Sequence, residues 1–366
     1  MGSRWVVLAT TAFIVGCAGA APSTANPTER PAITPAPSVS TAVPSASSTT
    51  PAIVAGEAWI AYQSDRGFYQ SDRGGDGIYL MRPDGTDQHE LLPDATYNAF
   101  HPDWSPDGTR IAFDAETDGG NEIWVANADG TDAKTLVARS TDCELSCGEV
   151  ALPAWSPNGL SIAFVRFQFT DLGLVSAAIE VQDVTSGDRR VVFRAPPLTA
   201  LNYPRWSPDG RSLVFEMTRY PDRSITSGSA TGSAIAVIDA VSAAAEPVIL
   251  TDWSMYATYP DWHPKADEIL FTTYDLNEFP GTDKRSNLYT MQSDGSGQTA
   301  LTTFGEAEQR ATQPTWTPDG TRIIFTLVGQ EASFDNPRNA AFIERGGSGL
   351  AILEAFATHP RSRPLP

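Results

Sequence analysis

Short apolar runs separated by polar turns recur along most of the chain. A typical unit is Pro-Asp-Trp-Ser-Pro-Asp-Gly at 102–108, followed after two residues by the apolar run Ile111-Ala112-Phe113. Ser-Pro-Asp-Gly fits a type I turn, because proline presets φ at the second position and glycine tolerates a positive φ at the fourth. Short apolar runs bounded by such turns are typical of β-strands. Each unit therefore predicts a hairpin between two strands, the first of which carries a tryptophan.

The unit recurs at an almost constant interval. Its tryptophan stands at 104, 155, 206, 262 and 316, so successive copies are 51, 51, 56 and 54 residues apart. Two further strand-like runs lie between successive units, as at 122–126 and 134–137. Four antiparallel strands in a repeat of this length are typical of a propeller blade, whereas a helical solenoid would need an apolar period of 3.6 residues. The sequence therefore predicts an all-β, six-bladed β-propeller of four-stranded antiparallel blades.

The sixth copy of the repeat is divided between the two ends of the propeller. Three strand-like runs between 59 and 92 match the last three strands of a blade that lacks its first strand. Residues 357–364 align with 257–264 around the repeat proline, with Ser362 in place of the tryptophan. A C-terminal strand that completes the first blade would remove the open edges of the ring. We therefore predict that the propeller occupies residues 56–366 and is closed by its C-terminal strand.

The first 55 residues have a different composition. Arg4 precedes an apolar run from 5 to 15, which is too short to span a bilayer and has the form of a secretory signal. Ile14-Val15-Gly16-Cys17 resembles a bacterial lipobox, so we predict a lipoprotein signal peptide at 1–16 and lipidation of Cys17. An ordinary signal peptide with a chance cysteine is the alternative. Residues 17–55 are rich in Ala, Ser, Thr and Pro, and we predict a disordered tether because they bury too little apolar surface.

The repeated phrase also has a specific family resemblance. Pro-x-Trp-Ser-Pro-Asp-Gly-x-x-Ile-Ala-Phe, followed by Ile-Trp-Val and a second Asp-Gly, resembles the repeat of TolB-type propellers and covers residues 57–364 in about six copies. TolB itself carries an additional N-terminal α/β domain, whereas a tether precedes the repeats here. The chain is thus similar to a TolB-type propeller lipoprotein and not to TolB proper. Similar propellers occur in prolyl oligopeptidase-type enzymes, but residues 346–350 are the nearest match to Gly-x-Ser-x-Gly and end in Leu350.

Charge and cysteine content indicate which partners the protein can bind and in which compartment it resides. The chain has 25 basic and 44 acidic residues, a formal net charge of −19. Such a surface disfavours nucleic acid and favours neutral or cationic partners, although solubility alone also explains it. Cys143 and Cys147 predict a small-loop disulfide in an extracytoplasmic protein, with free thiols as the alternative. Too few ligands surround them for a zinc site.

Loop lengths distinguish the two faces of the predicted propeller. We label the strands of a blade A to D from the channel outward; the A–B turns are tight, whereas the B–C connections are long and irregular. Length variation confined to one face is typical of a binding face, although tolerance of insertions is the alternative. The candidate contacts in these connections are aromatic or cationic residues: Arg66, Tyr69, Arg73, Tyr220 and Tyr274.

A second set of candidates lies at the predicted channel mouth, where strand A begins. The residues before the repeat prolines include the ligand-binding candidates His101, Tyr203, Tyr259, Gln313 and His359. His101, Gln313 and His359 fall on neighbouring blades, and imidazoles with an amide oxygen can bind a divalent transition metal. Oligogalacturonate lyases, which this propeller resembles, use His and Gln ligands for such a metal. We predict no metal and no cofactor, because no carboxylate ligand is assignable and polar channel residues account for the same pattern.

The function predicted from these patterns is binding. We expect a lipid-anchored, extracytoplasmic scaffold of the bacterial cell envelope that engages a peptide, protein or glycan at the face with the long B–C loops. We expect a monomer that meets the membrane only through its anchor and binds no nucleic acid; the TolB-type resemblance implies an envelope partner. The competing hypotheses are a metal-dependent polysaccharide lyase or hydrolase with its site at the channel, and a spacer without a ligand.

Overall fold

The computed structural model divides into two compact units, Met1–Pro51 and Ala52–Pro366. All residues that the structure describes belong to the second unit: 57–64, 76–139, 148–170, 173–223, 230–242, 245–275, 285–304, 309–329 and 338–365. These residues form 24 β-strands and one 3-10 turn, η2 (Trp253–Met255). Within them we find no helix that is long and apolar enough to span a bilayer.

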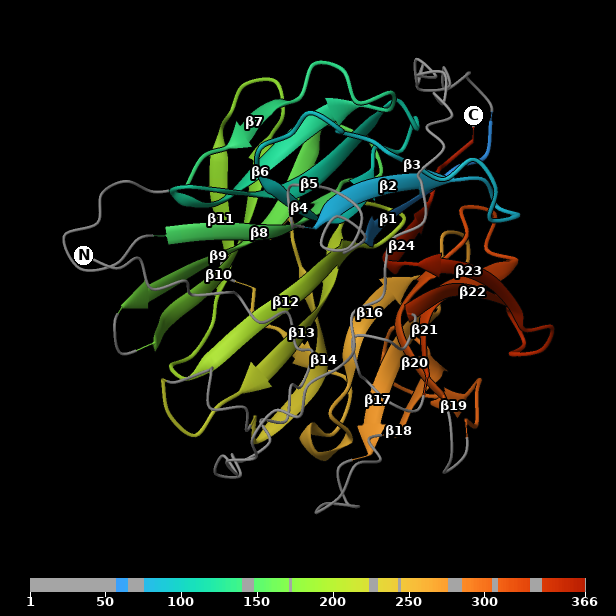
Figure 1. Cartoon of the computed structure of the whole chain (residues 1–366). Coiled ribbons are helices and arrows are strands. Elements are labelled where there is room, and N and C mark those ends of the chain that lie inside the picture. Colours follow the sequence, from blue (N-terminus) through green and yellow to red (C-terminus); the bar gives the residue numbers. More distant parts are fainter. Residues whose placement is uncertain are drawn as a thin grey trace, which may run out of the picture. The chain divides into compact units, whose positions relative to one another are not determined.

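The strands form six four-stranded antiparallel sheets, each of which is a propeller blade with strands in the order A to D (Figure 1). Blade 1 comprises β24 (Thr358–Ser362), β1 (Ile60–Ser64), β2 (Gly77–Met81) and β3 (His89–Glu90). Blade 2 comprises β4 (Asn98–Trp104), β5 (Arg110–Thr117), β6 (Gly120–Asn127) and β7 (Lys134–Val137). Blade 3 comprises β8 (Gly148–Trp155), β9 (Ser161–Thr170), β10 (Gly173–Asp183) and β11 (Arg189–Arg194).

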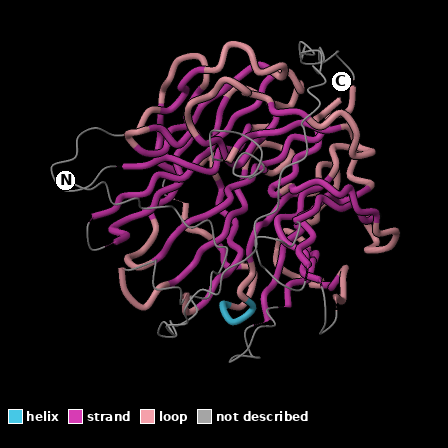
Figure 2. Tube along the Cα trace, in the orientation of Figure 1, coloured by secondary structure: helices cyan, strands magenta, loops and turns pink. Residues whose placement is uncertain are grey.

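The second half of the ring repeats the same order. Blade 4 comprises β12 (Thr199–Trp206), β13 (Ser212–Arg219), β14 (Gly232–Asp239) and β15 (Val248–Ile249). Blade 5 comprises β16 (Thr258–Trp262), β17 (Ile269–Asp275), β18 (Arg285–Met291) and β19 (Thr299–Ala300). Blade 6 comprises β20 (Gln309–Trp316), β21 (Arg322–Gly329), β22 (Arg338–Glu344) and β23 (Ala351–Phe356). Figure 2 shows these strands arranged around a common axis, with no helix between them apart from η2 in the described part of the chain.

The C-terminal strand closes the ring. β24 pairs with β1 in antiparallel register, with Ser362 opposite Ile60 and Arg361 opposite Ala61. Blade 1 therefore takes its A strand from the C-terminus and its other strands from the beginning of the propeller. The predicted six blades and their closure are confirmed.

The B strands carry the apolar core of the blades. The aromatic residue of each apolar run is fully buried, whether it is phenylalanine in blades 2 to 6 or tyrosine in blade 1: Phe113, Phe164, Phe215, Phe271, Phe325 and Tyr62. One core cluster joins Trp59 and Leu80 of blade 1 to Trp104 and Phe113 of blade 2. Neighbouring blades thus bury their sheets against each other, which no single blade can do alone.

In blades 2 and 4 the repeat tryptophan donates a hydrogen bond to the blade before it. Trp104 Nε1 donates to the carbonyl oxygen of Arg361 at 3.1 Å, and Trp206 Nε1 donates to that of Ala154 at 3.2 Å. At the closure, where Ser362 replaces the tryptophan, buried Arg363 takes a different bridging role. Its Nε donates to the carbonyl oxygen of Gly108 at 2.8 Å, and its Nη1 donates to that of Glu57 at 3.1 Å.

Candidate functional site

Every A strand has a β-bulge at the residue before the repeat proline. On β4, for example, Phe100 pairs with Asp114 and Asp103 with Ala112, so two residues face one. Proline suits a bulge because it has no N–H to donate to the neighbouring strand. The residue before it adopts a left-handed φ of 48° to 62° in all six blades: His101, Leu152, Tyr203, Tyr259, Gln313 and His359. This conformation costs roughly 1–2 kcal/mol for a residue with a side chain, so the surrounding structure has to hold it.

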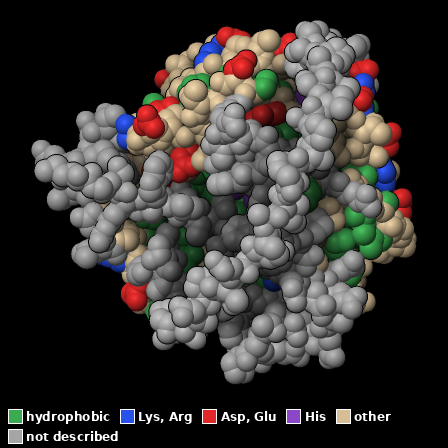
Figure 3. Space-filling view, in the orientation of Figure 1, with side chains coloured by type: hydrophobic (Ala, Val, Ile, Leu, Met, Phe, Trp, Pro, Cys, Tyr) green, Lys and Arg blue, Asp and Glu red, His purple; other side chains and the backbone are tan. Residues whose placement is uncertain are grey.

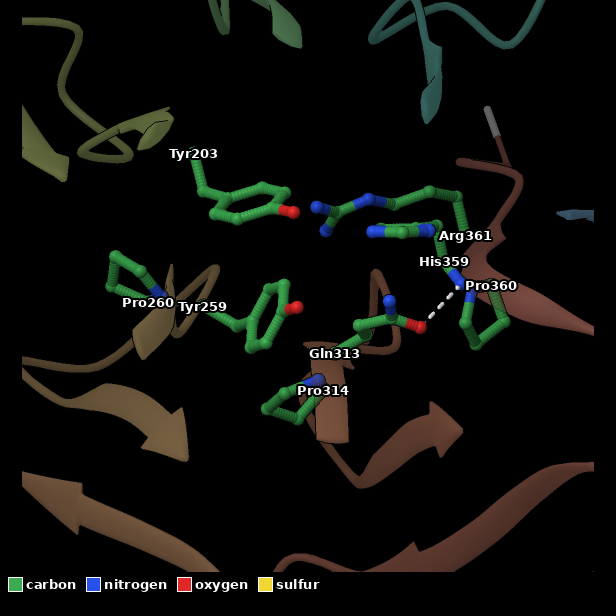
Figure 4. A pocket seen from close by; sticks show the side chains of 8 residues that line it. All are labelled: Tyr203, Tyr259, Pro260, Gln313, Pro314, His359, Pro360 and Arg361. Atoms are coloured by element: carbon green, nitrogen blue, oxygen red, sulfur yellow. Dashed lines mark hydrogen bonds between the residues drawn. The ribbon is translucent and has the colours of Figure 1, made fainter. Parts of the chain in front are cut away.

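The bulges bring side chains from different blades together at the centre of the ring. The ring centroids of His101 and His359 are 4.5 Å apart, and those of Tyr203 and Tyr259 are also 4.5 Å apart. Tyr203 and His359 stack with their centroids 5.9 Å apart. These four side chains are buried, and Figure 4 shows Tyr203, Tyr259 and His359 converging with Gln313. The structure thus unites the five candidates that the sequence predicted for the channel mouth.

Polar side chains of strands A and B fix the bulges across blade boundaries. His101 Nδ1 donates to Asp114 Oδ2 at 2.6 Å, while Asp114 Oδ1 accepts from the backbone N–H of Leu152 in the next blade at 2.8 Å. In blade 6 the acceptor is Gln313 Oε1, which receives the backbone N–H of His359 at 3.1 Å (dashed line in Figure 4). The left-handed residue of one blade is therefore held by a side chain of the blade before it.

Glu216 on β13 is a buried carboxyl group in the same layer. It accepts hydrogen bonds from Asn202 Nδ2 at 3.0 Å and from Thr218 Oγ1 at 2.6 Å. Burial raises the pKa of Glu216 to about 7, although hydrogen bonds from Thr218, Asn202 and the Tyr259 backbone act in the opposite direction. The carboxyl group thus titrates near neutral pH inside the propeller.

We expect Glu216→Gln to stabilise the protein above neutral pH. Between the unfolded pKa of about 4.5 and the folded pKa of about 7, the folded state binds more protons than the unfolded state, so stability falls as pH rises through this interval. Glutamine removes this loss, so the variant should gain roughly 1–3 kcal/mol at pH 8 and almost nothing at pH 4.5. Urea unfolding across this pH range measures the difference. Parallel pH profiles for the variant and the parent would contradict the assignment.

A ring of four charged side chains lies two residues further along the A strands, directly after the repeat proline, and sequence reasoning missed it. Asp103 lies 3.7 Å from Arg205 and 3.9 Å from Arg361, and Arg361 lies 3.7 Å from Asp261. Burial raises the pKa of both carboxyl groups, to about 6 for Asp261, and the charge of Arg205 opposes this shift. The signal was present, because the residue after the repeat proline is charged in four of the six copies.

The two aspartates of this charged ring also connect neighbouring blades. Asp103 Oδ2 accepts the backbone N–H of Trp155 at 2.8 Å, and Asp261 Oδ2 accepts that of Trp316 at 2.9 Å. Charge pairing and backbone hydrogen bonds thus satisfy carboxylates that would otherwise be costly to bury. Their observed role is to join blades.

The space left between these side chains is small. A cavity of about 10 Å³ is lined by Tyr203, Tyr259, Gln313, His359, Arg361 and three prolines (Figure 4). This is room for roughly one water molecule. Among the described residues, His101 Nε2 and both ring nitrogens of His359 are buried without a hydrogen-bond partner. These nitrogens, together with Arg205 Nε and Glu216 Oε2, are polar atoms of the centre without a hydrogen-bond partner in the described residues.

The donor set for a metal ion is incomplete in the described residues. We find there no group of three or more His, Cys, Asp or Glu side chains placed to hold a metal. Burial, followed by the charges of His101 and Arg205, lowers the pKa of His359 well below its usual value, so this imidazole is neutral. Gln313 Oε1 already accepts from Thr326 Oγ1 at 2.8 Å and from the His359 backbone. Two imidazoles are therefore the available ligands.

Of the five residues predicted to contact a ligand from the B–C loops, two lie in the described part of the chain. Tyr274 is half-buried, and its hydroxyl group lies 3.0 Å from Thr312 Oγ1 on the A strand of blade 6, so it faces the next blade. Tyr220, just beyond β13, is half-buried, and burial raises its pKa to about 12. The other predicted residues lie outside the described part of the chain: Arg66, Tyr69, Arg73, Cys17, Cys143 and Cys147. The visible surface of the described residues mixes acidic, basic and apolar groups (Figure 3).

Comparison with known proteins places the repeat in a defined family. The family model described as the TolB beta propeller domain matches residues 143–334, just over half of the chain. The "Tol-Pal system protein TolB" of Albidiferax ferrireducens is 29% identical over 121 residues, which cover 33% of this chain and 26% of that protein. The chain thus spans about a quarter of the length of this curated relative.

Solved structures share the fold. TolB from Acinetobacter baumannii superposes with a TM-score of 0.61 at 14% identity, over 83% of this chain and 66% of that chain. A putative TolB from Agrobacterium tumefaciens superposes with a TM-score of 0.53 at 18% identity, over 81% of this chain and 88% of that chain. At sequence identities of 14% and 18%, these superpositions show only that the proteins share the arrangement of the blades.

Proposed function

We propose a binding role that proceeds from one premise: the chain belongs to the TolB beta propeller domain family. The protein is a non-catalytic binding or scaffold propeller, and it engages a peptide, protein or glycan at the face that carries the B–C loops. The relative from Albidiferax ferrireducens is named for the Tol-Pal system, which supports a protein partner in the cell envelope. Lipidation at Cys17 and the 17–55 tether would hold a monomeric propeller outside the cytoplasm.

The observation that carries this proposal is the packing of the channel centre. The imidazole and phenol rings contact one another at 4.5 to 6.2 Å, and the cavity among them holds about 10 Å³. A pocket for a small molecule needs roughly 300–1,000 Å³. A sugar ring or a peptide therefore has no room between these side chains, and contact with a ligand falls to the rim of the loop face.

The competing enzyme hypothesis places a metal at His101 and His359. In its favour, Asp114 orients His101 through Nδ1, as carboxylates do for metal-bound histidines, and leaves Nε2 facing the channel. Against it, the described residues offer no carboxylate or third imidazole placed to ligate a metal ion together with these two. A divalent ion held by two protein ligands would be weakly bound compared with the usual three or four.

Site-specific photo-crosslinking in cells tests the proposed binding face. A crosslinking amino acid at exposed Val175 or Pro221, which border the B–C loops of blades 3 and 4, should yield a discrete product. The matched control is Leu160, which is 56% exposed in an A–B turn on the opposite face and should yield none. A product from Leu160 alone, or from no position, would contradict binding at the loop face.

Metal analysis of the same purified protein separates binding from catalysis. We expect no stoichiometric Mn, Ni or Zn in the parent, and the same result in His101→Ala and His359→Ala. A stoichiometric metal that is lost in both variants would replace the binding proposal with the enzyme hypothesis.

A further inference from the structure

The outer strand of blade 3 is a basic edge on an acidic protein. β11 reads Arg-Arg-Val-Val-Phe-Arg over 189–194, whereas the outer strands of the other five blades carry one lysine and no arginine between them. The whole chain has a formal net charge of −19. β11 also has six residues, whereas β3, β15 and β19 have two. Blade 3 therefore ends in a long strand whose charge is opposite to that of the protein.

Strand register assigns the side chains of β11 to two faces. Arg189, Val191 and Arg194 lie opposite β10 residues 182, 180 and 178, which share one face because side chains alternate along a strand. A bulge after Val191 keeps Arg194 on that face. The face packs toward blade 2, since Gln182 Nε2 donates to the carbonyl oxygen of Leu136 on β7 at 2.8 Å. An Arg-Val-Arg row therefore runs along its outer rim, where Val191 is 40% exposed.

The row carries more positive charge than the carboxylate beside it neutralises. Glu180 Oε1 lies 3.0 Å from Arg166 Nε and Glu180 Oε2 lies 3.8 Å from Arg189 Nη1, so one carboxylate is shared by two guanidinium groups. The turn before β11 adds Asp183, whose Oδ1 accepts two backbone N–H groups of the turn, and exposed Asp188. β11 itself contributes three positive charges and no negative one.

The junction with blade 2 leaves room beside this row. In four other blades, a Cβ built on the glycine of the C–D turn would contact the outer strand of the preceding blade or the residue after it: Gly85, Gly130, Gly295 and Gly347. A Cβ on Gly187, in the C–D turn of blade 3, would meet nothing within 4 Å. This turn therefore stands clear of blade 2, and the flank of β11 is accessible from the side of the ring.

The residues of the row also direct their backbone polar groups outward. The N–H of Ala195 donates to the carbonyl oxygen of Ala177 at 2.9 Å, and the N–H of Asp183 donates to that of Asp188 at 2.9 Å. Hydrogen-bonded pairs alternate with other pairs in an antiparallel ladder. The first and last arginines of β11, which adjoin these two pairs, therefore direct their N–H and C=O groups away from β10, as Val191 does. Among the described strands, β11 pairs only with β10.

We propose that β11 binds an extended acidic peptide segment as a fifth strand of blade 3. The segment carries acidic side chains at positions i and i+4, beside Arg189 and Arg194, and an aliphatic side chain at i+2, over Val191. Main-chain hydrogen bonds to an exposed edge supply affinity, and alternate side chains supply specificity. β10 already presents side chains to the inner side of β11 at this spacing of two. The surface is the outer strand of a blade, so it does not depend on binding at the B–C loops.

Charge favours an acidic segment over other occupants of this edge. Two β11 strands from two copies of the chain would bring arginines opposite arginines, and like charges directly opposite each other destabilise a sheet. A nucleic acid or an anionic bilayer is a wide surface that would also meet the acidic remainder of the protein. A short segment responds only to charges within roughly 8 Å at physiological ionic strength.

Fluorescence anisotropy of a labelled peptide with the purified full chain tests the proposal. The probe is Thr-Glu-Thr-Val-Thr-Glu-Thr, which in extended form places both glutamates and the valine on one face. Its isomer Thr-Thr-Glu-Glu-Thr-Val-Thr has the same charge but places its glutamates on opposite faces, and should bind at least about threefold more weakly. A probe N-methylated at both glutamates and the valine lacks three main-chain donors and should bind at least about tenfold more weakly.

A substitution on β11 locates the binding. Arg194→Glu should weaken binding of the probe at least about fivefold, because the new carboxylate repels the acidic segment. Arg211→Glu makes the same charge change at an exposed position in the A–B turn of blade 4 and should leave the affinity unchanged. Circular dichroism verifies that both variants retain the fold.

Three outcomes would overturn the proposal. Equal affinity for the probe and its N-methylated form would show attraction by charge without strand pairing. Absence of saturable binding, or equal weakening in both arginine variants, would remove β11 as the site. Dimers of the parent that disappear in Arg194→Glu, or binding of phosphatidylglycerol vesicles without binding of the probe, would replace the peptide with a second copy or a lipid surface.

Discussion

Deletion of residues 357–366 is expected to lower the melting temperature by roughly 10 °C or more, or to prevent folding altogether. The deletion removes β24, which is the A strand of blade 1, and exposes the inner edge of β1 together with fully buried Ile60 and Tyr62. It also removes His359 and Arg361 from the channel and leaves Asp103 and Asp261 without one of their partners. Each lost kcal/mol lowers the melting temperature by about 2–4 °C in a domain of 150–250 residues.

Two further variants separate the loss of the β24 strand from the loss of the last residues and of the Arg363 hydrogen bonds. Removal of Leu365 and Pro366 alone leaves β24 and Arg363 in place and should leave the melting temperature unchanged. Arg363→Ala keeps the strand but removes buried hydrogen bonds to Gly108 and Glu57, which should cost roughly 2–4 kcal/mol. An unchanged melting temperature after deletion of 357–366, measured by scanning calorimetry, would show that the ring does not depend on this strand.

Gly130→Ala is expected to destabilise the protein by roughly 2–5 kcal/mol. Gly130 lies in the C–D turn of blade 2 with φ at 81°, and an added Cβ would overlap the carbonyl oxygen of Leu91 in blade 1. The turn would have to move away from the neighbouring blade, and such overpacking adds roughly 1–3 kcal/mol to the cost of the left-handed φ. The second Asp-Gly of the repeat therefore lets blades approach each other.

Gly187→Ala is the matched control for this steric effect. Gly187 occupies the C–D turn of blade 3 with φ at 76°, but a Cβ there would meet nothing within 4 Å. Its substitution should cost only the roughly 1–2 kcal/mol of the left-handed conformation. Urea unfolding of the two variants isolates the contact between blades, and equal losses of stability would show that the approach to Leu91 is unimportant.

Both predictions concern contacts between blades, because these contacts hold the ring and the centre together. The same residues that close the ring, His359 and Arg361, also line the central cavity. Loss of closure should therefore disturb the centre as well. If a variant that lacks the closing strand still folds, a changed pKa of Glu216 would reveal this disturbance, because Glu216 lies in the same layer as the central side chains.

The sequence determined the fold because its signals are local and repeated. The Trp-Ser-Pro-Asp-Gly turns, the apolar runs after them and the interval of 51 to 56 residues were enough to predict four strands per blade and six blades. The C-terminal closure also followed from the repeat, since 357–364 carry its proline without its tryptophan. Turn chemistry and strand patterning act within a few residues, so a single chain displays them directly.

The candidate site was predicted in part. The channel position of His101, Tyr203, Tyr259, Gln313 and His359 followed from their place before the repeat proline, and the structure brings them together. Their left-handed backbone did not follow, because tyrosine and glutamine have no local preference for it and the enrichment of histidine in this region is too weak to predict it. Only the bulge, and polar side chains of strands A and B in the preceding blade, hold them there.

Tertiary structure alone decided how full the centre is and which charges meet there. Asp103, Arg205, Asp261 and Arg361 are up to 258 residues apart in the chain, and they form one ring because their blades surround one axis. Whether such side chains leave a pocket or fill it depends on rotamers and burial across six blades, which no local pattern encodes. The sequence therefore determined the propeller and the identity of its central residues, and their packing determined that the centre is filled.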